Sequence, residues 1–281
     1  MIVLGTATPG GGFPLYGDAF AAVLSAEEPR LEIEPRTTKG SAENVPLLEA
    51  GRLDLGLVAG EFASSALARP GTPLRVIAAM YSSPGMFMVR GDSPCRAIAD
   101  LRGKTVVLGT QGSGITALGR TVLGSLGIET TVITLEKAAD GPPMLLDARA
   151  EALWGAGVGW PAFVSLAGSG ARFIVPDARE VQAILEKNPA LQRVTLPAKS
   201  YPGQDAPLVS VGSWSFVLAN EKFPEEAAYL IARALHRAEA KLAARLEQAR
   251  ETTLANTAAA APRPDLLHPG VARYLREAGI G

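Results

Sequence analysis

Cysteine and histidine are scarce in this sequence of 281 residues, which contains one cysteine, Cys95, and two histidines, His236 and His268. A single cysteine excludes a disulfide within the chain and any cysteine-rich zinc or iron–sulfur site, and two histidines leave few ligands for a metal ion. No stretch approaches the roughly 20 apolar residues that span a bilayer, because glycine or charge interrupts every apolar run. We therefore expect no metal, no cofactor and no membrane-spanning segment.

An excess of basic charge is also missing. Lysine and arginine together number 27, against 28 aspartate and glutamate residues, which gives a formal net charge of −1. No basic run is present that could neutralise several phosphates, so nucleic acid is not an expected partner. With 47% hydrophobic residues the composition is that of a globular protein, and the length predicts about two domains.

What the sequence does contain is an alternation of apolar runs and turn signals that is typical of α/β proteins. Such alternation predicts parallel strands joined by crossover helices, and a second series of elements begins after residues 82–85. The predicted strands are 2–5, 31–36, 53–58, 74–80, 86–89, 105–108, 131–135, 150–154, 173–175 and 208–218, and the predicted helices are 15–26, 41–50, 95–101, 115–126, 177–187 and 224–249.

Two glycine-rich turns lie between a predicted strand and a predicted helix, at residues 6–12 (TATPGGG) and 109–114 (GTQGSG). Such a turn lets the backbone approach a ligand and points free N–H groups and the positive end of the helix dipole at an anion. Neither turn matches a nucleotide-binding fingerprint. Ligands of open α/β sheets bind at the carboxyl ends of the strands, so the pair predicts a carboxylate site. The alternative is that the glycines only permit tight turns.

Other side chains near these strand ends are candidates for the same site. Ser41 and Asn44 open a predicted helix, where they either cap the helix or face a ligand. The aromatic candidates lie in or beside strand-end loops, where a flat ring either lines a pocket or belongs to the core. The candidate ligand-binding residues are Thr8, Gly11, Gly12, Phe13, Tyr16, Ser41, Asn44, Tyr81, Gln111, Ser113, Gly114, Ile115, Thr116 and Trp160.

Side chains for catalysis are few. The pattern around His236 indicates a surface residue, and that around His268 a turn and capping residue. Ser113 stands in a Gly-Ser-Gly turn, but a nucleophile elbow would need glycine at positions 111 and 115. No base is paired with Cys95 at a motif spacing. We therefore expect a binding protein rather than an enzyme.

Residues 8–17 (TPGGGFPLYG) are similar to the S-T-G-G-T-Y-Y-P-x-G start of the TAXI family, the extracytoplasmic solute receptors of TRAP transporters. Further segments that resemble this family run in order over essentially the whole chain. They are 39–44 (KGSAEN), 47–58 (LLEAGRLDLGLV), 100–106 (DLRGKTV), 112–114 (GSG), 201–205 (YPGQD) and 267–274 (LHPGVARY).

The resemblance implies the type II periplasmic-binding-protein fold, an α/β clamp of two domains, each a mainly parallel sheet flanked by helices. Domain one would comprise residues 1–84 and 205–281 and domain two residues 85–204, with hinges near 81–85 and 201–207. It also implies a monomeric periplasmic receptor that captures a small organic acid in the cleft between the domains. The acid, an amino acid, oxoacid or other carboxylate, would be delivered to TRAP membrane permease subunits. The chain opens as a strand without an export signal, so a processed or trimmed form is expected.

The chain departs from the family pattern at three polar positions. Residues 58–61 (VAGE) stand where the family often has V-Q-S-D, and Gly12 and Ile115 each replace a threonine. The departures predict a less polar site than usual. One carboxylate would be held by the glycine turns with Asn44, Ser113 and Thr116, and the less polar body would lie against Phe13, Tyr81 and Trp160. A sensory ligand-binding protein and an enzyme on the same fold remain open alternatives.

Overall fold

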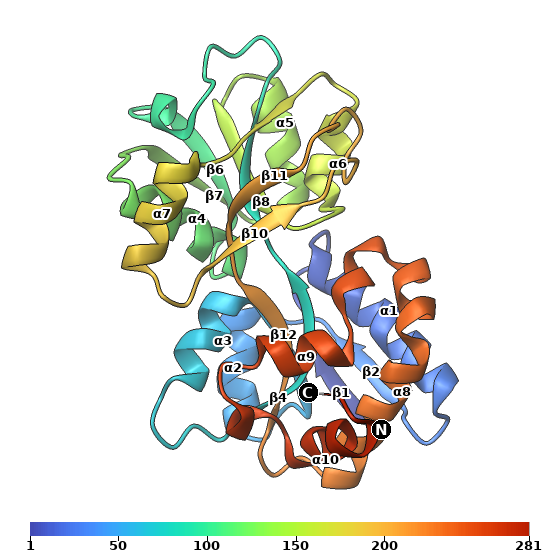
Figure 1. Cartoon of the computed structure of the whole chain (residues 1–281). Helices are drawn as coiled ribbons and strands as arrows, with labels where there is room; N and C mark the ends of the chain where they lie inside the picture. The colour runs from blue at the N-terminus through green and yellow to red at the C-terminus, as the bar shows by residue number, and fades with distance from the viewer. Residues whose placement is uncertain (281) are drawn as a thin grey trace. The chain divides into compact units, whose positions relative to one another are not determined.

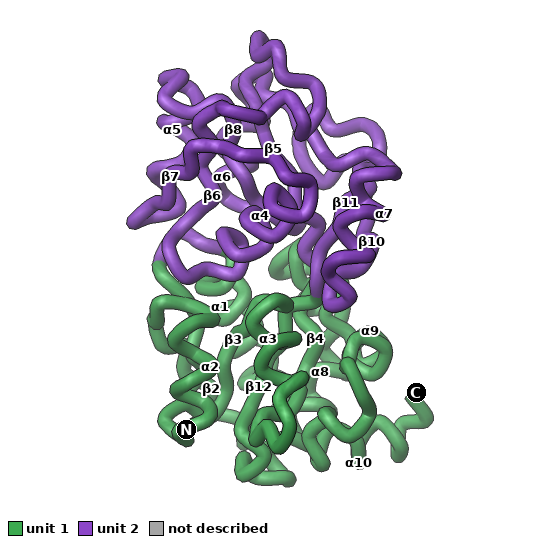
Figure 2. The backbone as a smooth tube through the Cα atoms, turned by 90° about the vertical axis from the view of Figure 1, so that its left-hand side faces the viewer, with its two compact units in different colours: residues 1–8, 12–81, 214–281 green, residues 9–11, 82–213 purple. Residues whose placement is uncertain are grey.

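The computed structural model describes residues 1–280, and the chain divides into two compact units (Figure 2). Unit 1 comprises residues 1–8, 12–81 and 214–281, and unit 2 comprises residues 9–11 and 82–213. Apart from the short stretch 9–11, the chain therefore passes from one unit to the other after Tyr81 and after Ser213. The hinges near 81–85 and 201–207 stay predictions.

Unit 1 is built on a five-stranded sheet in the order β2-β1-β3-β12-β4. β1 pairs in parallel with β2 and β3, and β12 pairs antiparallel with β3. One apolar core lies under α1, α8 and α10, and a second lies under α2 and α3 on the opposite face. The bounds are β1 Ile2–Gly5, α1 Gly12–Glu27, β2 Ile33–Arg36, α2 Ser41–Glu49, β3 Leu55–Val58, α3 Gly60–Leu67, β4 Leu74–Ser82, β12 Trp214–Asn220, α8 Glu225–Arg245, α9 Leu254–Ala260 and α10 Pro269–Ala278 (Figure 1).

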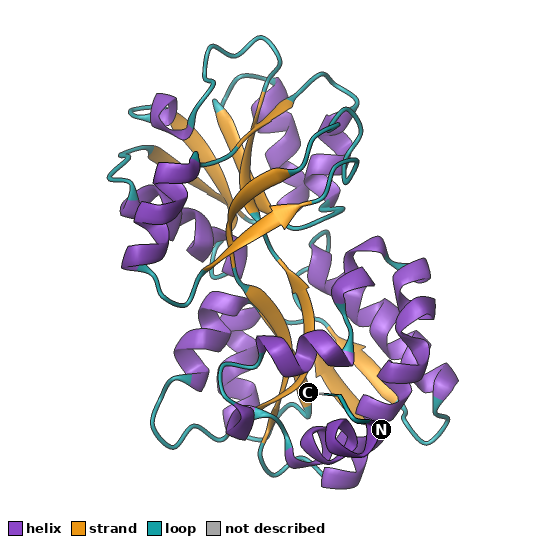
Figure 3. Cartoon of the chain, viewed as in Figure 1, coloured by secondary structure: helices purple, strands orange, loops and turns teal. Residues whose placement is uncertain are grey.

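Unit 2 contains a five-stranded sheet in the order β7-β6-β8-β5-β9 and a separate antiparallel pair, β10-β11 (Figure 3). β6 pairs in parallel with β7 and β8, and β5 pairs antiparallel with β8 and β9. The bounds are β5 Gly85–Val89, β6 Thr105–Thr110, α4 Gly114–Ser125, β7 Thr131–Leu135, α5 Gly141–Leu146, β8 Ala152–Ala156, α6 Pro161–Ala167, β9 Arg172–Ile174, α7 Ala178–Lys187, β10 Gln192–Leu196 and β11 Leu208–Gly212.

The α/β class is confirmed, with differences in detail. Both sheets are mixed, because β12 and β5, the strands next to the passages between units, run antiparallel to their neighbours. The single strand predicted over 208–218 is two strands that belong to different sheets, and the chain passes between units at the break. The helix predicted over 224–249 ends at Arg245, where Leu246 takes an extended conformation and a short 3₁₀ helix follows at Glu247–Glu251.

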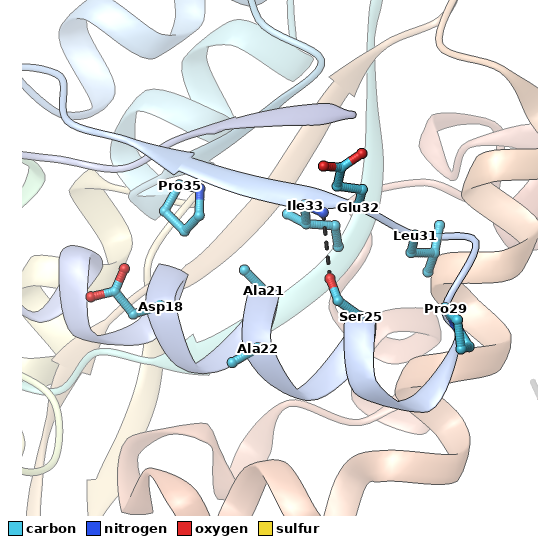
Figure 4. Close-up of a pocket in the computed structure, with 9 residues that line it drawn as sticks. All are labelled: Asp18, Ala21, Ala22, Ser25, Pro29, Leu31, Glu32, Ile33 and Pro35. Atoms are coloured by element: carbon cyan, nitrogen blue, oxygen red, sulfur yellow. Dashed lines mark hydrogen bonds between the residues drawn. The ribbon is translucent and has the colours of Figure 1, made fainter.

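An open surface groove of about 670 Å³ runs along the edge strand β2 and α1 in unit 1 (Figure 4). The register between β1 and β2 points the backbone hydrogen-bonding groups of Ile33 and Pro35 away from β1, toward the open edge of the sheet. Neither offers a free N–H there, because the Ile33 amide donates to Ser25 Oγ at 3.4 Å and proline has none. The edge is therefore protected against pairing with another strand. No predicted ligand residue lines this groove.

His268 is a buried N-cap of α10, as its predicted capping role requires. The Gly270 N–H donates to Nδ1 at 3.3 Å, so Nε2 carries the proton and donates to the Phe223 carbonyl at 3.0 Å. Burial lowers the pKa of this imidazole below its ordinary 6.5. In the cation, a second N–H on Nδ1 would face the Gly270 N–H, so the folded state favours the neutral ring.

We expect His268 to make the stability of unit 1 sensitive to acid. Because its pKa is lower in the folded state, its contribution is fully present above pH 6.5 and is lost as the pH falls through the lowered pKa. The His268→Asn variant keeps a capping acceptor but does not titrate. The Tm difference between wild type and His268→Asn, measured from pH 8 to pH 5, should shrink toward pH 5. A difference that is constant over this range would contradict the assignment.

Candidate functional site

In unit 1 the glycine-rich turn connects β1 to α1, which begins at Gly12. Thr8 is half-buried and Gly12 is buried. The first turn of a helix leaves its N–H groups without intrahelical acceptors, and Pro14 has none, so Gly12 and Phe13 supply the donors here. These donors and the helix dipole suit an acceptor oxygen at the start of α1.

Asn44 lies on α2 and is fully buried. Its Nδ2 lies 3.2 Å from the carbonyl of Gly5, 2.9 Å from that of Thr6 and 2.8 Å from that of Leu57, so one amide connects the ends of β1 and β3. Ser41 Oγ, also buried, accepts from the Ala59 N–H at 2.9 Å, just after β3. Both side chains thus hold strand-end loops in place. Asn44 Oδ1 has no hydrogen-bond partner and lies against Gly5.

Tyr16 and Tyr81 form a buried pair in unit 1, with ring centroids 5.6 Å apart and an edge-to-face arrangement. Burial raises the pKa of both hydroxyls above their usual range, so both are neutral donors at physiological pH. Phe13 is half-buried and packs against the same core. The Tyr16 hydroxyl has no hydrogen bond of normal geometry within the described residues.

Gln248 joins this group and was not predicted from the sequence. It lies in the 3₁₀ helix that follows α8, and only 6% of its surface is exposed. A Cβ atom on Gly12 would lie 3.1 Å from Gln248 Nε2, 3.3 Å from Oε1 and 3.6 Å from the Tyr81 hydroxyl. The fold therefore brings Gln248 and Tyr81 to the start of α1 from distant parts of the chain.

In unit 2 the second glycine-rich turn connects β6 to α4. Ser113 is the N-cap of α4, and its Oγ accepts from the Thr116 N–H at 3.2 Å and donates to the Thr110 carbonyl at 2.8 Å. The buried Thr116 hydroxyl lies 2.8 Å from the Thr110 carbonyl and 3.0 Å from that of Leu108. Both hydroxyls close the turn. The N–H groups of Gly114 and Ile115 lack intrahelical acceptors and are the donors that α4 offers. Gln111 is exposed.

Two buried tryptophans support unit 2 on either side of its sheet. Trp154 donates from Nε1 to the Ile115 carbonyl at 2.8 Å, so it fixes the first turn of α4. Trp160 precedes α6. Its backbone N–H donates to the Tyr201 hydroxyl at 2.8 Å, and this bond holds the segment 201–207 within unit 2. Next to Trp160, Pro161 and Ala162 line an apolar pocket of about 450 Å³ together with Ala139, Pro142 and Pro143 of unit 2.

The fold thus places the candidates in two groups at strand ends. Within residues 1–280, no three His, Cys, Asp or Glu side chains lie close enough together to hold a metal ion. No helix among these residues combines the length and apolar character needed to cross a bilayer. The unit 1 group is Thr8, Gly12, Phe13, Tyr16, Ser41, Asn44 and Tyr81, and the unit 2 group is Gly11, Gln111, Ser113, Gly114, Ile115, Thr116 and Trp160.

Solved structures with the same fold include periplasmic binding proteins. MatC from Rhodopseudomonas palustris with bound malate is 16% identical, with a TM-score of 0.62 over 99% of this chain and 95% of that chain. A TctC solute-binding protein from Polaromonas is 17% identical, with a TM-score of 0.55 over 99% and 97%. The periplasmic aliphatic sulphonate binding protein SsuA from Escherichia coli is 17% identical, with a TM-score of 0.55 over 98% and 82%.

These similarities define the class of fold, a two-domain periplasmic-binding-protein fold with α/β sheets flanked by helices. Residues 4–279 match the model of the NMT1-like family, and the chain belongs to that family. The assignment to the TAXI family within TRAP transport stays a prediction. The TctC protein and SsuA are binding proteins by name, and MatC has malate bound.

Proposed function

We propose that this protein is an extracytoplasmic solute-binding receptor that captures a small organic acid and delivers it to a TRAP-type membrane permease. The observation that carries the proposal is the pair of strand-end glycine turns, one in each unit, that open α1 and α4. Helix starts with free N–H donors bind carboxylates without any basic side chain. The periplasmic location and the permease rest on the family resemblance and on the fold of the similar proteins.

The ligand's carboxylate is assigned to the start of α4. Because Ser113 and Thr116 use their hydroxyls to close the turn, the backbone N–H groups of Gly114 and Ile115 do the binding. Ser113, Thr116, Ser41 and Asn44 then act as positioning residues. The less polar part of the ligand lies against the apolar pocket beside Trp160.

A thermal-shift screen of acids tests the receptor function. Pyruvate, 2-oxobutyrate, malate, succinate, L-glutamate and butyrate are each added to the purified protein. An acid present at 100 times its Kd should stabilise the protein by about 2.7 kcal/mol. In the periplasmic-binding-protein class, ligand binding closes the domains about a hinge, so small-angle scattering should show a more compact particle with the bound acid. If no acid binds to demonstrably folded protein, the proposal is wrong.

The binding role of the α4 backbone is tested by Gly114→Pro. Proline suits the first position of a helix, and Ser113 has the extended conformation that a following proline requires, so the helix is retained while one N–H is removed. We expect the affinity for the best acid of the screen to fall about 10- to 100-fold. Gly114→Ala adds a side chain but keeps the N–H, and it should bind more tightly than Gly114→Pro. Equal affinities would show that this N–H does not bind the acid.

A further inference from the structure

The amide of Gln248 stands at the start of α1, and it makes no hydrogen bond within residues 1–280 although the residue is more than nine-tenths buried. Its atoms are not among the fully enclosed polar atoms without a partner, so the amide remains open to water or to a ligand. The neighbouring residue Ala249 is fully buried, and the Thr252 hydroxyl donates to the Met80 carbonyl at the end of β4. The backbone that carries Gln248 is therefore anchored immediately after residue 248.

Gly12 makes this position possible. The amide approaches so closely that a Cβ atom on residue 12 would lie only 3.1 Å from Nε2 and 3.3 Å from Oε1. A Cβ at this position would make the amide shift by a few tenths of an ångström. Gln248 thus supplies a polar group beside the first turn of α1.

We infer that Gln248 is a specificity-determining residue, whose Nε2 donates a hydrogen bond to an acceptor oxygen that the ligand carries in addition to its carboxylate. The inference rests on the proposed function and extends it. The donors around this position are the α1 N–H groups, the Gln248 amide and the neutral Tyr81 hydroxyl. Uncharged donors of this kind suit a keto, hydroxyl or second carboxylate oxygen. The ligand class is therefore an oxygen-bearing organic acid rather than an unsubstituted aliphatic acid.

The test compares wild type with Gln248→Met by calorimetric titration of butyrate, 2-oxobutyrate, malate and succinate. Wild type should bind at least one oxygen-bearing acid about 10-fold or more tightly than butyrate. Gln248→Met keeps the length of the side chain but not its donors, so it should lose this margin and keep its affinity for butyrate. Gly12→Ala should reduce the margin as well, because its Cβ displaces the amide.

Stability without ligand provides a second readout, with Gln204→Met as the matched control. Gln204 is also buried, but its Oε1 accepts from the Ser200 N–H at 3.0 Å and its Nε2 donates to the Ala206 carbonyl. Gln204→Met should lower the Tm and leave the difference in affinity between the oxygen-bearing acids and butyrate unchanged. Gln248→Met should leave the ligand-free Tm unchanged or raise it, because no hydrogen bond is lost.

Four outcomes overturn the inference. If Gln248→Met retains the preference for oxygen-bearing acids, or if wild type binds butyrate as tightly as the others, the assigned hydrogen bond does not exist. If Gln248→Met lowers the ligand-free Tm as much as Gln204→Met does, Gln248 has a structural role instead. If wild type binds none of these acids or those of the wider screen, the proposed function itself fails, and the inference fails with it.

Discussion

Replacing Trp154 by alanine is expected to destabilise the protein by about 3–5 kcal/mol, the usual cost of deleting a fully buried tryptophan. The indole packs beside Phe87, with ring centroids 4.7 Å apart, and it fills space that Gly85 and Gly119 leave open. A Cβ on either glycine would lie within 3 Å of the ring. Its removal therefore leaves a cavity at the centre of unit 2, and denaturant unfolding of unit 2 measures the loss.

The same substitution should weaken ligand binding, because Trp154 Nε1 holds the Ile115 carbonyl in the first turn of α4. Trp154→Phe keeps much of the ring but loses this hydrogen bond. Because the Ile115 carbonyl is then unpaired, we expect the free energy of unfolding to fall by about 1–3 kcal/mol. Trp214→Phe is the matched control, since Trp214 is only partly buried in unit 1. Should Trp154→Phe bind acids as tightly as wild type, the hydrogen bond does not position the turn.

Replacing Asn44 by alanine is expected to cost about 2–4 kcal/mol of unfolding free energy, because the buried carbonyls of Gly5, Thr6 and Leu57 lose a shared donor. Asn44→Asp should be worse at pH 7, since a carboxylate would face the same three carbonyl oxygens. Protonation removes that charge, so Asn44→Asp should recover stability relative to wild type as the pH is lowered. Chemical unfolding at pH 7 and pH 5 measures both effects.

Asn220→Ala is the control for Asn44. Its Nδ2 donates to the Leu48 carbonyl at 3.1 Å from a half-buried position in the same unit, where water can replace the lost donor. We expect a loss of about 1 kcal/mol or less. If Asn44→Ala costs no more than Asn220→Ala, the amide is not what holds the ends of β1 and β3 together.

The order of elements was largely predictable because alternating apolar runs and turn residues are local signals. The strands at 2–5 and 131–135 and the helix over 177–187 agree with the structure within a residue. The prediction of a single strand over 208–218 is wrong. Leu208–Gly212 and Trp214–Asn220 share one apolar pattern, although they pair in different sheets. Pairing partners are set by residues far away in the chain, which the local pattern does not contain.

The two glycine turns were recognisable from their residues, but the use of each side chain was not. Asn44, Ser113 and Thr116 were predicted as ligand contacts, and their polar groups bond to strand-end carbonyls in the structure. Polar residues at a strand end can face either the loop or a ligand, and the local sequence is the same in both cases. Their direct contact with ligand stays a prediction.

By itself, the sequence determined the α/β class, the absence of a cysteine framework and the two glycine-rich turns, because composition, periodicity and glycine placement act over a few neighbouring residues. Only the tertiary structure decided which polar groups remain free. Gln248 lies 236 positions after Gly12, and it reaches the start of α1 because the helix breaks at Leu246 and Thr252 bonds to Met80. Whether a buried amide is paired depends on that three-dimensional neighbourhood, which no motif around residue 248 records.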